Sequence, residues 1–169
     1  AEAEAFSFFA NAGLPINATT ELYGWAGYQT REGEAAGFYR RAQDSRNVPA
    51  IYPDGFLPMI TTDIEDFSAV GGARGVIAGW DWDASLGYGR NELGYGVADS
   101  LNTSLGATSP TSFDAGALIY DQITANLDFV RSYDLDGLAG PLSVAFGAEY
   151  RLEGYEIKAG EEASYITGD

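Results

Sequence analysis

The sequence lacks cysteine and histidine entirely, and these two absences remove several classes of chemistry at once. Without them the chain has no disulfide bond, no thiolate nucleophile, no Cys/His zinc site and no Ser-His-Asp triad. Basic side chains are scarce too, with 9 Lys and Arg against 25 Asp and Glu, for a formal charge of −16. Because this charge repels phosphates and no basic stripe offsets it, we expect no nucleic-acid partner.

Long hydrophobic runs are also missing, although 46% of the residues are hydrophobic. No stretch approaches the roughly 18 apolar residues that a membrane-spanning helix needs. Abundant instead are glycine, with 22 residues, and aromatic residues, at 14% of the chain. This composition favours strands and turns over helices, so we expect an all-β chain.

Period-two alternation of apolar with polar or small residues is the dominant pattern. It is clearest from Leu142 to Glu153, and it recurs at 122–129 and 82–89. With weaker candidates added, it predicts about six antiparallel strands, which we interpret as a single fragment, residues 1–169, of a larger barrel domain. The predicted strands are about 6–12, 20–31, 66–77, 82–97, 117–131 and 142–157.

The predicted connections alternate in length along the chain. Segments 13–17, 78–81 and 133–141 are short, whereas the loops 32–65 and 98–116 are long. In an antiparallel sheet this places the short turns on one edge and the long loops on the other. That asymmetry, with aromatic residues near both strand ends, is typical of an outer-membrane β-barrel, here a partial one. A soluble sandwich with one buried face gives the same alternation and remains an alternative.

Several segments resemble the barrel of TonB-dependent outer-membrane receptors. They are LYGWAGYQTREG (22–33), GFYRR (37–41), RNVPAIYPDGFLP (46–58), WDASLGYGRNE (82–92), SPTSFD (109–114) and AFGAEYRLE (145–153). The resemblance implies a location in the bacterial outer membrane and uptake of a bulky nutrient such as a ferric siderophore. The partners would be lipid and the remainder of the receptor barrel. The family's plug domain, TonB box and terminal aromatic residue have no counterpart here, so we expect a fragment of such a receptor.

A slice of a barrel has two unpaired edges and one apolar face, which both favour self-association. The alternative hypothesis is therefore an extracellular, amyloid-like cross-β filament, in which identical copies of the released fragment are the partners. Stacked acidic side chains would then need cations or arginine pairs to offset their repulsion.

Basic residues concentrate in the first long loop, beside aromatic ones. Guanidinium groups suit anionic acceptors and aromatic rings suit flat ligands, so we expect this loop to contact an anionic, aromatic ligand. Ion pairs within the loop, or contacts with lipopolysaccharide phosphates, are the alternative interpretation. The candidate ligand-binding residues are Arg40, Arg41, Arg46, Phe38, Tyr39 and Tyr52.

Closely spaced carboxylates form the second set of candidates, because they supply the oxygen ligands that Ca²⁺ prefers. None of the clusters completes an EF-hand pattern, and solvation of strand ends is the alternative interpretation. Apart from Ca²⁺ we expect no cofactor. Paired carboxylates also occur in glycosidases, but here they lie at turn and loop positions without a focused cleft, so we expect no enzyme. The candidate calcium ligands are Asp63, Glu65, Asp66, Glu161 and Glu162.

Overall fold

The computed structural model describes residues 1–168, which form one six-stranded antiparallel sheet with 68% of residues in strands. The sheet order β1-β2-β5-β6-β7-β8 follows the chain, so the sheet is a meander. This confirms the predicted fold class. The six strands are β1 (Glu2–Asn17), β2 (Thr20–Ala36), β5 (Met59–Ile77), β6 (Trp80–Ala98), β7 (Phe113–Tyr133) and β8 (Leu142–Ala159).

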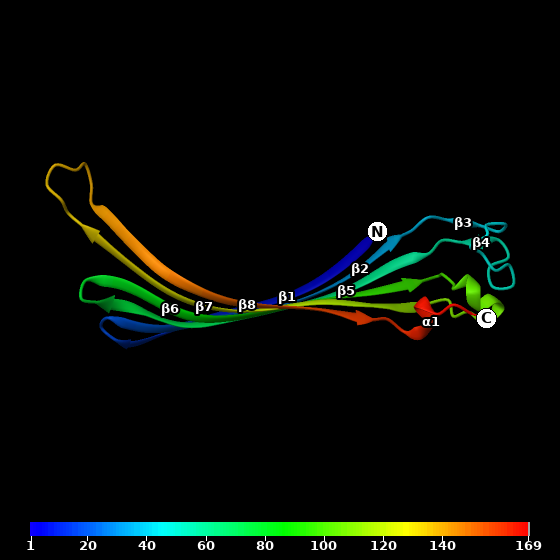
Figure 1. The fold of residues 1–169 in the computed structure, drawn as a ribbon, viewed down its shortest axis with the longest axis horizontal. Coiled ribbons are helices and arrows are strands. Elements are labelled where there is room, and N and C mark those ends of the chain that lie inside the picture. Colours follow the sequence, from blue (N-terminus) through cyan, green and yellow to red (C-terminus); the bar gives the residue numbers. More distant parts are fainter. Residues whose placement is uncertain (169) are drawn as a thin grey trace.

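The short turns and the long loops lie at opposite ends of the sheet, as the sequence predicts (Figure 1). The turn end carries Ala18–Thr19, Ala78–Gly79 and 134–141, and the loop end carries 37–58 and 99–112. Ala78 and Gly79 have positive φ angles of 51° and 80°, as in the type I′ turn that suits the twist of a hairpin.

The strands are longer than the sequence predicted, and the predicted boundaries were wrong at most ends. The ladder between β2 and β5 continues to Ala36 and Met59, so the loop predicted at 32–65 shrinks to 37–58. The loop predicted at 98–116 likewise shrinks to 99–112. These extensions carry charged residues on one face, so their sequence lacks the apolar alternation by which a strand is recognised. They still form strands, because the backbone hydrogen bonds of a ladder do not depend on side-chain polarity.

The predicted turn at 13–17 was also wrong, because this segment continues β1 and the chain turns at Ala18–Thr19. Pro15 is tolerated there because β1 is an edge strand, and proline is compatible with a strand that has a free side. A register shift between Pro15 and Asn17 accompanies it.

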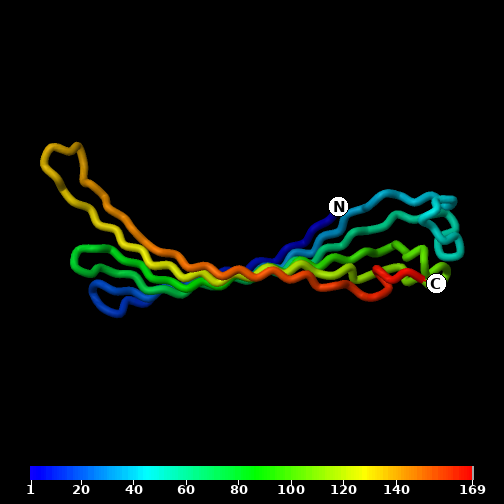
Figure 2. The backbone as a smooth tube through the Cα atoms, viewed as in Figure 1, coloured from blue at the N-terminus to red at the C-terminus, as the bar shows by residue number. Residues whose placement is uncertain are grey.

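The sheet is strongly twisted and both of its edges are open. In Figure 1 the β1–β2 hairpin lies below β8 at the turn end, whereas β1 lies above β8 at the loop end. The tube in Figure 2 shows the same crossing. Neither β1 nor β8 has a second partner strand within residues 1–168, so the sheet does not close into a barrel.

Cross-strand partners share a face of the sheet, so the register defines two faces. One face carries Leu22, Ala73, Ala84, Leu127 and Ala148, which form a continuous row across β2, β5, β6, β7 and β8. We call it the Trp82 face. The opposite face, which carries Trp25 and Arg74, is the Trp25 face.

Almost no apolar side chain is buried within the described part of the chain. Phe56, 7% exposed, and Ile119, 1% exposed, are its buried hydrophobic residues. A soluble domain of this size normally buries about two thirds of the surface of its unfolded chain around a core. Within residues 1–168 no helix has the length and apolar character to cross a membrane. The apolar side chains on the sheet therefore need a cover that the described residues do not supply.

The loop end is organised by short elements and side-chain hydrogen bonds. A small ladder joins β3 (Arg40–Arg41) and β4 (Gly55–Phe56) within loop 37–58. The second loop contains the 3₁₀ helix η1 (Thr103–Thr108), and α1 (Glu162–Tyr165) follows β8. The Asn102 side chain donates to the carbonyl oxygens of Ala163 and Ile166 at 3.0 and 2.9 Å, so it fastens the segment after β8 to this loop.

Candidate functional site

The turn-end half of the Trp82 face is an apolar belt across all six strands. It comprises the side chains of this face within 6–16, 20–28, 67–77, 80–88, 123–133 and 142–152, where Arg131 is the one charged residue. Each stretch has the length of about 9–11 residues that a tilted strand needs to cross a bilayer. Leu86 is 60% exposed and Leu14 is also 60% exposed, so the belt is bare.

Aromatic side chains lie along both borders of the belt. Near the turn end, Phe146 stacks on Phe129 with ring centroids 5.2 Å apart and meets Trp80 edge-on at 5.1 Å. At the other border, Tyr28 and Phe67 are cross-strand partners on the same face, and Phe67 packs against Tyr88. Aromatic residues along both borders of an apolar band are typical of strands that cross a membrane.

Arg131 lies at the turn-end border of the belt rather than within it. Its guanidinium donates to the carbonyl oxygen of Ala78 at 2.9 Å and lies 4.9 Å from the ring centroid of Tyr133. A second ring, that of Trp80, is 6.0 Å away. The charge is therefore held against aromatic faces and the hairpin turn, an arrangement that keeps it at the rim of the apolar surface.

The turn-end half of the Trp25 face is mainly polar, although Phe9, which is 61% exposed, stacks on Trp25 there with ring centroids 5.8 Å apart. Arg74 forms a 2.9 Å ion pair with Glu21, and its guanidinium lies over the ring of Tyr23 at 5.2 Å. The Tyr23 hydroxyl donates to Asp83 at 2.6 Å. In this half of the sheet the two faces therefore differ sharply in polarity.

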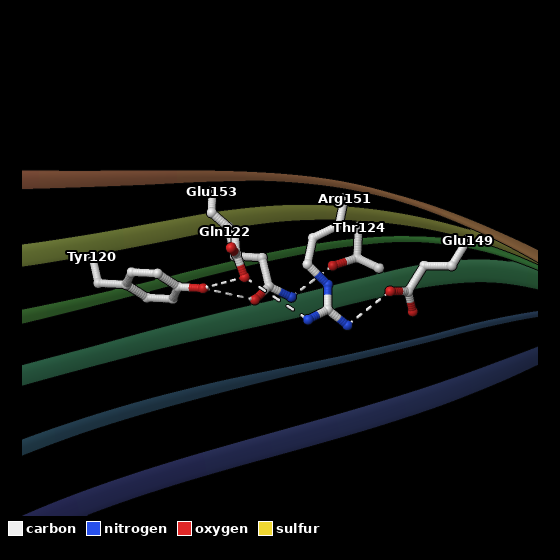
Figure 3. Close-up of polar contacts among 6 residues, drawn as sticks. All are labelled: Tyr120, Gln122, Thr124, Glu149, Arg151 and Glu153. Carbon is white, nitrogen blue, oxygen red and sulfur yellow. Dashed lines mark hydrogen bonds and ion pairs between the residues drawn. The ribbon is translucent and has the colours of Figure 1, made fainter.

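A ladder of side-chain contacts on the Trp25 face of β7 and β8 extends this polar surface (Figure 3). The Tyr120 hydroxyl lies 2.7 Å from a carboxylate oxygen of Glu153, to which it donates. Arg151 donates to Glu149 at 2.7 Å and lies 3.8 Å from Glu153. Gln122 donates to Thr124 at 2.7 Å in the same group. Gln122 and Thr124 are half-buried, and the other side chains of this ladder are exposed.

In the loop-end half the polarity of the two faces is exchanged. The Trp82 face becomes acidic there, and Arg90 and Lys158 are the cations among its carboxylates. Arg90 and Lys158 both bind Glu92, at 3.0 and 3.1 Å, and these hydrogen bonds lower the pKa of the Glu92 carboxyl, the one from Arg90 most. The carboxylates are Glu2, Glu4, Glu32, Glu34, Asp63, Glu65, Glu92, Asp121 and Glu156.

The Trp25 face becomes apolar in this same half. Ile64, Leu93, Leu118 and Ile157 form one row across β5 to β8, and Arg31 on β2 continues that row. Ile157 is 68% exposed and Tyr155 is 64% exposed. We call this set the loop-end apolar patch, which comprises Ile60, Ile64, Leu93, Tyr95, Val97, Leu118, Tyr155 and Ile157.

The predicted ligand-binding residues of loop 37–58 do not converge on one site. Arg46 forms a bidentate ion pair with Asp44, with both contacts at 2.9 Å. Tyr52 stacks on Phe56 at 4.8 Å, and the Tyr39 hydroxyl donates to the carbonyl oxygen of Asp54 at 2.7 Å. Arg40 and Arg41 occupy β3 and form no ion pair within residues 1–168, and Phe38 is 82% exposed.

The predicted calcium ligands do not lie together, because they are distributed over both faces of the sheet and the segment after β8. Asp63 and Glu65 lie on the Trp82 face, whereas Asp66 lies on the Trp25 face, where it accepts a 2.6 Å hydrogen bond from Asn91. Glu161 accepts from the backbone N–H of Asp114 at 3.1 Å and shares an open hollow of about 890 Å³ with Asp63, while Glu162 begins α1. Within residues 1–168 no three acidic side chains are grouped as metal ligands.

The sequence contained a signal for the exchange of faces that the prediction missed. In β6 the large apolar residues lie at even positions up to Tyr88 and at odd positions from Leu93 onward, so the alternation changes phase once along the strand. The same shift occurs in β8.

Comparison of the chain with protein-family models, with curated proteins and with solved structures finds no match in any of the three.

Proposed function

We propose that this chain is a wall segment of an outer-membrane β-barrel, within a TonB-dependent receptor that takes up a bulky nutrient such as a ferric siderophore. The observation that carries the proposal is the apolar belt of the Trp82 face. The belt crosses six strands, is bordered by aromatic residues on both sides and is opposed by a polar Trp25 face.

A bilayer is the cover that fits the belt best. Its hydrocarbon accommodates an apolar surface about 25 Å tall, and its interfaces favour the aromatic borders. The polar Trp25 face then faces the lumen of the barrel, where water satisfies Glu21, Asp83 and Arg151. A soluble sandwich would instead cover the belt with a second sheet, and residues 1–168 form one such large sheet.

The open edges support a segment of a larger wall. In hydrocarbon every backbone N–H and C=O group needs a partner, so only closed barrels span membranes as strands. β1 and β8 each lack a partner on one side within the described chain, and transmembrane barrels begin at about eight strands. The strands that pair with β1 and β8 are therefore assigned to the remainder of the receptor barrel.

The distribution of the loops supports uptake from one side of the membrane. Loops 37–58 and 99–112 lie at one end of the sheet, beyond strand segments that extend past the belt. In outer-membrane barrels the longer loops are extracellular. Together with the resemblance of the sequence to TonB-dependent receptors, this supports a role in which the loop end meets the nutrient first.

A filament of identical copies is the second candidate, and the two open edge strands favour it, since such edges template pairing with another chain. The strong twist of the sheet opposes flat cross-β stacking. Electron microscopy of the purified chain distinguishes the two candidates. Filaments with a repeat near 4.7–4.8 Å would support the filament and contradict the barrel wall.

The membrane assignment is tested with the chain's own tryptophans. Trp80 and Trp82 lie on the Trp82 face and Trp25 on the opposite one. Two variants, Trp25→Phe/Trp80→Phe and Trp80→Phe/Trp82→Phe, each retain one tryptophan of the segment. Both are reconstituted into vesicles of brominated phospholipid as part of the closed barrel that supplies partners for β1 and β8, and the variant that lacks all three tryptophans gives the background. We expect strong quenching of Trp82 and weak quenching of Trp25. Equal quenching, or none, would contradict a lipid-facing belt.

A further inference from the structure

We propose that the loop-end apolar patch, together with Arg31, binds an anionic amphiphile: a ligand with an apolar or aromatic body and one acidic group. The inference rests on the proposed function, which turns the Trp25 face toward the lumen. It deepens that function by naming the class of ligand and by moving the ligand from loop 37–58 to the sheet.

The apolar part of the site is a broad surface whose centre is half-buried and whose aromatic rings are exposed. Ile64, Leu93 and Leu118 form its centre as direct cross-strand neighbours on β5, β6 and β7. The Tyr95 and Tyr155 side chains are 39% and 64% exposed. This apolar surface lies outside the belt, on the opposite face of the sheet. Contact of apolar side chains with water is unfavourable, so exposed apolar surface of this kind is typical of a binding surface.

Arg31 supplies the charge that selects an anion. Its cross-strand partners on the Trp25 face are Ala5 and Ile64, so no carboxylate faces it directly. The diagonal neighbour Asp66 is held by Asn91 at 2.6 Å, and Arg31 forms no ion pair within 4.0 Å in the part of the chain that the structure describes. A guanidinium beside apolar side chains binds a carboxylate or sulfonate through paired hydrogen bonds.

The charge pattern of the loop-end half restricts an anion to the face that carries Arg31. On the Trp82 face of β2 and β5 the same level carries Glu32, Asp63 and Glu65, which repel anions. An acidic ligand is thus disfavoured on one face of the sheet and favoured on the other. The apolar patch next to Arg31 excludes small hydrated anions as preferred ligands, because they gain nothing from the surrounding Ile and Leu side chains.

The experiment uses the closed barrel that contains this segment, in lipid nanodiscs, and a matched pair of probes, 2-naphthoate and its neutral amide, 2-naphthamide. Binding of each is measured by equilibrium dialysis, with empty nanodiscs as the blank. We expect the acid to bind at least tenfold more tightly than the amide. Arg31→Gln should reduce this preference to less than threefold, whereas Arg41→Gln, in the loop, should leave it unchanged.

A second pair of variants tests the apolar part of the site. Leu93→Asn should weaken binding of both probes about tenfold, and Val70→Asn, on the same face in the turn-end half, should not. Equal binding of acid and amide, or equal effects of Arg31→Gln and Arg41→Gln, would overturn the proposal. Quenching by brominated lipid, recorded on the same samples, reports the belt independently, so a failure of the barrel assignment is distinguishable from a failure of the ligand site.

Discussion

The two halves of the sheet share one continuous backbone ladder and differ in which face is apolar. In the turn-end half, Leu86 and Leu127 lie on the Trp82 face and Ser85 and Asn126 on the other. In the loop-end half, Leu93 lies on the Trp25 face. The hydrogen-bonded ladder continues unchanged where the apolar face switches sides. We therefore infer that the switch reflects different surroundings of the two halves and not a change of fold.

The boundary between the halves is sharp. On the Trp82 face of β5, Phe67 is followed toward the loop end by Glu65 and Asp63, and Tyr28 on β2 donates to Glu65 at 2.9 Å. Apolar and acidic rows are therefore adjacent. On β6 and β7 the change falls one row nearer the turn end, because Arg90 and Asp121 already lie level with Phe67, so the boundary runs obliquely across the sheet. The proposed barrel wall accounts for this boundary, since the interface of a bilayer separates an apolar band from polar surroundings. Each half should accordingly tolerate substitutions that the other does not.

The largest expected effect is that of a charge placed in the belt. Leu86→Arg should destabilise the vesicle-inserted barrel that contains this segment by about 2–4 kcal/mol, because Arg near mid-bilayer loses its hydration. Ser85→Arg, one residue earlier and on the other face, should cost less than about 1 kcal/mol. Urea titrations of the two reconstituted variants measure the difference. Equal costs would remove the distinction between the faces in this half.

A smaller effect is expected from adding a methyl group to glycines with positive φ at the two ends of the sheet. At the turn end, a Cβ on Gly79 (φ 80°) would lie 3.0 Å from Cζ of Arg131. At the loop end, Gly106 (φ 57°) has nothing within 4 Å of that position. We expect both substitutions to cost about 1–3 kcal/mol, Gly79→Ala through its approach to Arg131 and Gly106→Ala through backbone strain alone, because the ψ angle of −138° at Gly106 belongs to a region that essentially only glycine adopts.

Melting of the two variants, each in the reconstituted barrel, measures these costs, and Gly71→Ala serves as a control because its Cβ position is also open. A Gly106→Ala variant as stable as the Gly71→Ala control would contradict the backbone strain expected at Gly106.

The turn-end half was predictable from the sequence because its side chains alternate in one phase. The pattern from Leu142 to Leu152 placed β8 correctly, and the six-stranded antiparallel order followed from the connections. The loop-end half was not predictable in the same way. There Glu32 and Glu34 pair with Asp63 and Thr61, and such polar pairs are typical of loops in sequence although they belong to a ladder here.

The candidate sites were harder to predict, because they depend on the register and on loop conformation. Arg40, Arg41 and Arg46 are close in sequence, but Arg46 is taken up by Asp44, only two residues away, while the others occupy β3. Arg31 belongs to the same basic run and lies on the sheet instead. Which face it occupies is set by its pairing with Ile64, a long-range contact that no local pattern specifies.

A modest effect is expected from the ion pairs, which also differ between the halves. Arg151→Ala leaves Glu149 and Glu153 unpaired on the same face, and we expect a cost of about 0.5–1 kcal/mol that shrinks as salt screens the repulsion. Arg90→Ala, in the loop-end half, leaves Glu92 still paired with Lys158 and should cost less. Urea titrations at low and high salt compare the two, and a salt-independent loss would point to packing instead.

The smallest effect is confined to loop 37–58 and concerns pH. Hydrogen bonds from the side chain and backbone N–H of Arg46 hold the pKa of the Asp44 carboxyl well below its usual value of 3.8. A carboxyl with a lowered pKa in the folded state contributes stability that is fully present above the unfolded value and is lost as the pH falls through the folded one. The loop should therefore keep its Asp44–Arg46 pair at pH 4 and lose it only in stronger acid. Carboxyl chemical shifts recorded across this range measure the pKa, and Arg46→Gln should return it toward the usual value. An ordinary pKa in the unaltered chain would mean that Arg46 is available to a ligand after all.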